Sequence, residues 1–183
     1  GGDVDLSYFK NLTDFEFDYQ KVTSLVGYKD KALQLTNINV TGCQISDELP
    51  TFGSGMTQLA FGNPDATFGN SFTGRLTKII NNSRTTIQTL RADSLKAGVV
   101  KNDLFGVLPI FSEFTAFTTF NIAYNSNITG SLNTLVSNTA LTHFDISGTG
   151  ITTVDTNFEF PTGTNIVSFK ANDLSESQKL RVV

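Results

Sequence analysis

The chain has 183 residues, of which 39% are hydrophobic and 16% are charged, as in an ordinary globular domain. Seventeen acidic and thirteen basic residues give a net charge of −4 at pH 7, which argues against nucleic acid or an anionic membrane as the main partner. No run of eighteen apolar residues occurs, so we expect no insertion into a membrane.

One apolar pattern recurs along nearly the whole chain. It reads apolar-x-x-apolar-x-apolar, with a further apolar residue about five positions later. Its first and sixth copies, Leu12–Leu25 and Leu141–Val154, align without a gap. Self-similarity of this kind predicts a solenoid, in which each repeat buries its apolar edge against its neighbours. In chain order, the second apolar position of the pattern falls at Phe15, Leu33, Leu59, Leu90, Phe120, Phe144 and Phe169.

Each repeat is expected to contribute one short strand to a parallel sheet. Alternation such as Phe15-x-Phe17 or Leu33-x-Leu35 places two apolar side chains on the same side of a strand. The segments 76–82 and 132–138 are expected to be helical or irregular. The loops after Phe61 and Leu90 are several residues longer than the pattern requires.

Several segments resemble extracellular-type leucine-rich repeats. Their "L-T-G-x-L/I-P" half is similar to the segments at 40–42, 72–76, 105–109 and 128–132, and their strand-and-turn half to FNIAYNSNITG and FDISGTGIT. Phe often replaces Leu, and the asparagine that should follow the strand is clear only at Asn125.

The resemblance implies an α/β solenoid of about seven coils, with a parallel sheet on its concave face and irregular or short helical segments on its convex face. It implies one domain over residues 1–183. Residues 1–11 would form the N-terminal edge and residues 12–174 the repeats. Residues 175–183 would be a tail or the start of further sequence.

A recognition or adhesion module is the function that this resemblance implies. The module would bind a protein or glycan partner through its concave face and would act outside the cell, on a cell surface or on a virion. The alternative is a structural or receptor-binding component of a virion or extracellular filament. In that case the coil would serve as a rigid subunit of a homo-oligomer or larger assembly.

Candidate binding residues are the polar side chains that flank the apolar pair of each strand and point outward. In the predicted register these residues are Asp14, Glu16, Asp18, Gln34, Gln58, Arg91, Asp93, Asn121, His143, Asp145 and Lys170.

Three of these residues, Asp14, Glu16 and Asp18, form an acidic cluster. Such a cluster can hold calcium, meet a basic partner, or keep a terminal strand solvated. The third interpretation requires no ligand, so we assign no metal site.

Enzymatic activity is not expected. The chain has one His and one Cys, too few for a typical transition-metal site, and no Walker-type loop; we assign no cofactor. His143 is expected to be exposed and Cys43 to be a small buried hydrophobe. A hydrolase built on a right-handed β-helix is the remaining alternative, and it would need carboxylates aligned in a groove.

Four phenylalanines, Phe111, Phe114, Phe117 and Phe120, follow one another at intervals of three residues. We expect them to form an interior stack. An exposed stripe would instead indicate a protein interface.

Overall fold

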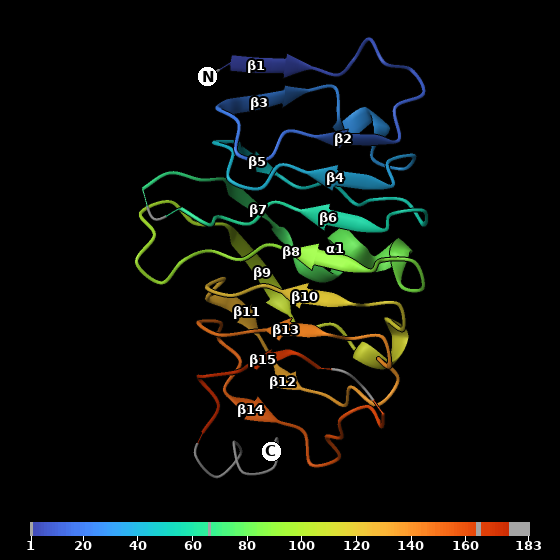
Figure 1. The fold of residues 1–183 in the computed structure, drawn as a ribbon, viewed down its shortest axis with the longest axis vertical. Coiled ribbons are helices and arrows are strands. Elements are labelled where there is room, and N and C mark those ends of the chain that lie inside the picture. The colour runs from blue at the N-terminus through green and yellow to red at the C-terminus, as the bar shows by residue number, and fades with distance from the viewer. Residues whose placement is uncertain (1, 66, 164–165, 176–183) are drawn as a thin grey trace.

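The computed structural model describes residues 2–65, 67–163 and 166–175, and in this part the chain winds into a parallel β-solenoid of about seven turns (Figure 1). One strand from each turn enters a seven-stranded parallel sheet, with the turns in order along it. This confirms the predicted solenoid and its parallel sheet. In spatial order the strands are β2 (Asp14–Glu16), β4 (Asn37–Asn39), β6 (Gln58–Ala60), β8 (Thr89–Arg91), β10 (Thr119–Asn121), β13 (His143–Asp145) and β15 (Ser168–Lys170).

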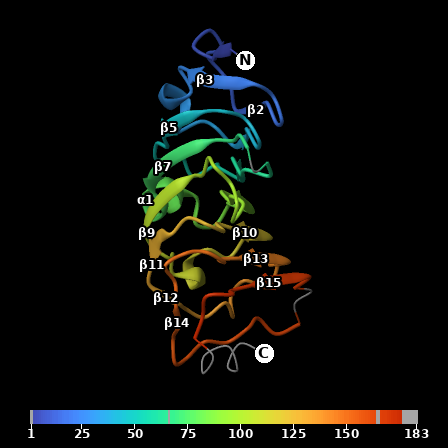
Figure 2. The same cartoon turned by 90° about the vertical axis from the view of Figure 1, so that its left-hand side faces the viewer.

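A second parallel sheet runs along another side of the solenoid (Figure 2). Its strands are β5 (Ser46–Glu48), β7 (Ser71–Arg75), β9 (Asp103–Val107) and β11 (Asn127–Thr129). Two further parallel pairs join β1 (Gly2–Asp5) to β3 (Val22–Val26), and β12 (Ser131–Leu132) to β14 (Thr153–Val154).

Helical structure is sparse in the described part of the chain. It consists of α1 (Leu76–Ile80) and the single 3-10 turns η1 (Lys29–Lys31), η2 (Asn81–Ser83) and η3 (Phe111–Glu113). The expectation of helical or irregular chain is confirmed at 76–82, which is helical, and at 133–138, which is irregular; Leu132 itself belongs to β12. The class is therefore a β-solenoid with several parallel sheets, and the predicted α/β class is too rich in helix.

Phenylalanine rings form the centre of the core in the later turns. Phe111, Phe114, Phe117 and Phe120 are all buried, which confirms the predicted interior stack. The ring of Phe111 meets those of Phe117, Phe120 and Phe144 at centroid distances of 6.4, 5.0 and 5.4 Å. Phe144 stacks in turn on Phe120 and Phe169, so aromatic contacts pass from one turn to the next.

The predicted register of the second turn is wrong. Its strand is Asn37–Asn39, and Ile38 rather than Leu33 lies between Phe15 and Leu59 in the sheet. Leu33 is 73% exposed in the turn after η1, whereas Ile38 is 3% exposed. Both Leu33-x-Leu35 and Ile38-x-Val40 satisfy the alternation, but the earlier pair lies in the connection between η1 and β4 and the later pair begins within β4.

This corrected register predicts unequal losses of stability from two similar substitutions. Ile38→Val removes one buried methylene and should lower the free energy of unfolding by about 0.5–1.5 kcal/mol. Leu33→Val should change it by less than about 0.5 kcal/mol, because the side chain is exposed. Urea unfolding of both variants measures the two values, and a larger loss from Leu33→Val would restore the original register.

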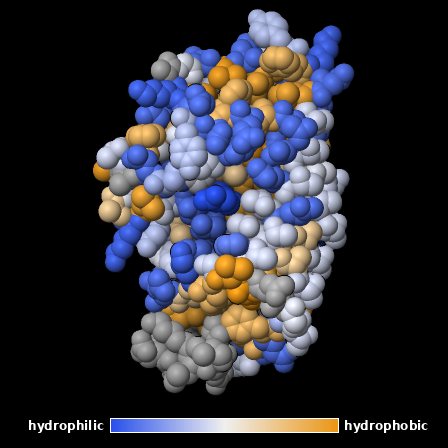
Figure 3. All heavy atoms as spheres, viewed as in Figure 1, coloured by the Kyte–Doolittle hydropathy of each residue, from blue (hydrophilic) through white to orange (hydrophobic). Residues whose placement is uncertain are grey.

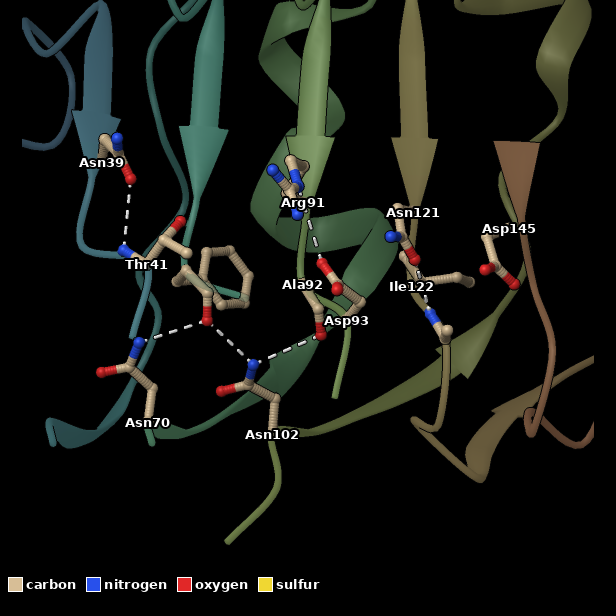
Figure 4. A network of polar contacts seen from close by, with 12 residues as sticks. Asn39, Thr41, Asn70, Arg91, Ala92, Asp93, Asn102, Asn121, Ile122 and Asp145 are labelled. Carbon is tan, nitrogen blue, oxygen red and sulfur yellow. Dashed lines mark hydrogen bonds and ion pairs between the residues drawn. The ribbon is translucent and has the colours of Figure 1, made fainter. Parts of the chain in front are cut away.

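Buried asparagines tie successive turns together (Figure 4). The Asn102 amide donates to the carbonyls of Phe61 and Ala92 at 3.0 and 3.3 Å, while its Oδ1 accepts the N–H of Phe72 at 3.0 Å. Asn70 makes the same set of bonds one turn earlier and Asn125 one turn later. The ladder is therefore more complete than the single Asn125 that the sequence indicated.

Candidate functional site

A hollow on the outer face of the seven-stranded sheet lies over β8, β10, β13 and β15. This hollow, which we call the sheet depression, has a volume of about 360 Å³. Hydrophilic side chains gather near the middle of the face seen in Figure 3. The depression is lined by Arg91, Thr119, Asn121, His143, Phe144, Asp145, Ser168 and Lys170.

Five of the predicted binding residues meet in this depression. They come from four turns and lie together because the strands pair without offset, so that Arg91, Asn121, Asp145 and Lys170 occupy one row. His143 lies in the neighbouring row with Thr119 and Ser168. These last two hydroxyl residues were not among the predicted site residues.

The remaining predicted residues lie elsewhere. Asp14 and Glu16 are on β2, at the other end of the sheet, and Gln58 is on β6, beside β8. Gln34 is not on the sheet, because it belongs to the turn before β4; its amide donates to the carbonyls of Lys10 and Leu12. The predicted position of Gln34 on a strand was wrong for the same reason as the register of Leu33.

Part of the polar row also has a structural role. Asn121 Oδ1 accepts the N–H of Ala123 at 3.1 Å (Figure 4). Asp145 Oδ1 accepts the N–H of Ser147 at 3.0 Å. Such bonds to the backbone two residues later hold the turn that follows each strand. The second oxygen of Asp145 lies 3.6 Å from the ammonium of Lys170. The Lys170 side chain is nevertheless 59% exposed, so it can also contact a partner from outside.

Asp93 lies just beyond the depression and is largely buried. Its Oδ1 is 3.7 Å from Nε of Arg91 and makes no hydrogen bond within the described part of the chain. A side chain at Gly62 would fill the space of this carboxylate, since a Cβ there would lie 2.5 Å from Asp93 Oδ1. Desolvation raises the pKa of Asp93, and the nearby Arg91 opposes that rise.

The raised pKa of Asp93 gives a pH dependence with a defined sign. The folded chain binds the Asp93 proton more tightly than the unfolded chain does. As pH rises through and above the ordinary carboxyl range, ionisation of Asp93 therefore lowers the free energy of unfolding. Asp93→Asn removes the penalty. We expect the melting temperature of this variant, relative to wild type, to be higher at about pH 7 than at about pH 3. The opposite trend in calorimetry would show that the pair with Arg91 dominates.

The acidic cluster is held by uncharged donors. Hydroxyls of Thr13 and Thr36 donate to Asp14, which lowers its pKa, and the Asn39 amide donates to Glu16 at 2.8 Å. Among the described residues, no group of three or more His, Cys, Asp or Glu side chains is placed to hold a metal ion.

The single histidine is exposed and the single cysteine is buried. His143 is exposed, as expected, with Nδ1 2.9 Å from the Thr142 hydroxyl. Cys43 is buried, as expected, and its thiol donates to the carbonyl of Phe17. Burial raises the pKa of this thiol, which disfavours the reactive thiolate.

The fold defines the chain as a parallel β-solenoid of about seven turns. A comparison with protein-family models, curated proteins and solved structures finds no match. Within the described residues, no helix has the length and apolar character needed to cross a membrane.

Proposed function

We propose that this chain is a non-enzymatic recognition module that binds a protein or glycan partner through the outer face of its seven-stranded sheet. The observation that carries the proposal is the sheet depression, where Arg91, His143 and Lys170 lie beside amide, hydroxyl and carboxylate groups from neighbouring turns. A rigid parallel sheet fixes the spacing of these groups, which favours recognition of an extended polar partner.

We further propose that the solenoid is a divergent leucine-rich-repeat coil. The asparagine ladder supports this assignment, because Asn70, Asn102 and Asn125 each follow a strand and bond the backbone of neighbouring turns. Cys43 and Thr149 occupy the corresponding places in two other turns and bond a carbonyl at each. The second sheet and the scarcity of helix mark the divergence.

The location that fits this proposal is outside the cell, on a cell surface or on a virion. In these places the exposed sheet face would be open to a ligand from the surrounding medium.

Paired variants test the proposed binding face. Arg91→Ala with Lys170→Ala removes two cations from the depression, and Arg75→Ala with Lys78→Ala removes the same two residue types from outside it. Both variants and the wild type are applied to panels of immobilised glycans and extracellular protein domains. Ligands of the wild type should lose at least about tenfold in affinity with the first variant only. Equal binding by that variant would contradict the proposal.

The alternative is a structural or receptor-binding subunit of a virion or extracellular filament. Four exposed apolar side chains in the first turn favour it, since they suit burial against another subunit. They are Tyr8, Phe9, Tyr19 and Val26. Light scattering separates the two functions: a monomer supports the recognition module, and a regular multimer supports the assembly subunit.

A further inference from the structure

A second recess lies away from the sheet depression, beside the long loop that follows β8. Its walls include Lys96 and Lys101 from this loop, Tyr124 from the next turn, and Ser147, Gly148 and Asp173 from the two turns after that. Its volume is about 290 Å³. We call it the turn recess, because it is built from the turns that follow the strands.

The loop that supplies these two lysines is closed at its base. The N–H of Asn102 donates to the Ser94 hydroxyl at 3.1 Å, and both residues are buried. Within the loop, the N–H of Gly98 donates to the carbonyl of Leu95 at 2.9 Å. The closed base holds the two lysines over the neighbouring turns, as expected of a compact loop with its ends together.

The positive charge in the recess is not neutralised by an ion pair. Within residues 2–65, 67–163 and 166–175, neither Lys96 nor Lys101 has a carboxylate oxygen within 4.0 Å. Lys101 donates to the carbonyl of Lys96 at 3.1 Å, and its ammonium lies 5.8 Å from the centre of the Tyr124 ring. The one carboxylate in the wall, Asp173, already accepts the N–H of Gly148.

A buried hydroxyl in the same wall lacks a partner. Ser147 is 4% exposed, and its Oγ makes no hydrogen bond in the described part of the chain. Burying an unpaired hydroxyl is unfavourable. The fold does not require this hydroxyl, because buried Ala123 occupies the equivalent position one turn earlier, as their matching backbone bonds show.

We propose that the turn recess binds an oxyanion, such as a sulfate, phosphate or carboxylate group carried by a ligand. The two ammonium groups supply the charge. Ser147 Oγ is covered in this structure, so its side chain must rotate toward the recess to donate a hydrogen bond to one oxygen of the anion. This site is independent of the sheet depression, so it can be present whether or not the sheet face binds a partner.

Titration of the ¹⁵N-labelled protein with sodium sulfate, phosphate or acetate at constant ionic strength tests the site. We expect saturable shifts of the amides of Lys96, Ser147 and Gly148, with millimolar affinity. Lys96→Gln with Lys101→Gln should weaken binding by about tenfold or more, and Ser147→Ala by about threefold to tenfold. Lys21→Gln with Lys78→Gln removes the same charge from other exposed positions and should leave the affinity unchanged.

Shifts that do not saturate, or that persist unchanged in the Lys96/Lys101 variant, would overturn the proposal. The spectra also show whether each variant is folded. A sulfated disaccharide, its unsulfated form and O-phosphoserine then distinguish a glycan source of the anion from a phosphorylated side chain.

Discussion

Phe111→Ala should lower the free energy of unfolding by about 3–5 kcal/mol. Phe111 is 1% exposed, and its ring packs edge-on against Phe117, Phe120 and Phe144. These partners come from two successive turns, so the cavity would weaken the contact between turns as well as the packing within one turn. Urea unfolding followed by circular dichroism measures the loss.

Phe105→Ala is the matched control for this variant. Phe105 is 40% exposed on β9, where its ring lies beside the Arg75 guanidinium. We expect its removal to cost less than about 1 kcal/mol. Similar losses from the two variants would contradict the placement of Phe111 at the centre of the core.

Asn102→Ala should lower the free energy of unfolding by about 2–5 kcal/mol. The substitution leaves the buried N–H of Phe72 without its acceptor, at about 1–3 kcal/mol. It also removes donors from the carbonyls of Phe61 and Ala92, at about 0.5–1.5 kcal/mol each. Those carbonyls keep a second donor, from Asn70 and Asn125 respectively, which limits the loss.

Two further variants distinguish the ladder from a general effect of losing an amide. Asn127→Ala removes an exposed amide that donates to Asp103, and it should cost less than about 0.5 kcal/mol. Asn102→Asp keeps an acceptor for Phe72 but places a buried carboxylate against two carbonyls. Its stability should therefore rise as pH falls, because protonation removes the charge. If Asn102→Asp were as stable as wild type at neutral pH, the ladder geometry would be wrong.

The sequence predicts most strands of the seven-stranded sheet because each of these turns offers one clear alternating apolar pair. The second turn fails because Leu33-x-Leu35 and Ile38-x-Val40 lie five residues apart and both alternate. The route of the chain from η1 to β4 decides which pair enters the sheet, and the spacing of apolar residues does not predict that route.

The second sheet could not be read from the pattern. The segments at 72–74 and 105–106 contain glycine, which weakens the strand signal. Their pairing depends on the turns being in register across the solenoid, which is a property of the stack and not of one repeat. The missed asparagines did leave a signal: Asn70 and Asn102 each stand two residues before a buried apolar residue, as Cys43 does before Ile45. The long loops displaced them from the expected spacing.

The candidate site was predictable where the register was correct. Arg91, Asn121, His143, Asp145 and Lys170 were identified because the outward position of each strand follows from its apolar pair. Their convergence into one depression, and the separation of Asp14 and Glu16 from it, depend on the order of strands along the sheet. The turn recess was not predictable, because the direction of a loop is not encoded in periodicity.

Interstrand nuclear Overhauser effects test the solenoid most directly. The parallel pairing of β10 with β8 and β13 predicts contacts of the Phe120 backbone with Leu90 and Phe144 in the parallel pattern, and ring contacts between Phe120, Phe144 and Phe169. Close Hα–Hα contacts between these strands in an antiparallel pattern would contradict the solenoid, and so would a Phe144 ring without contact to Phe120.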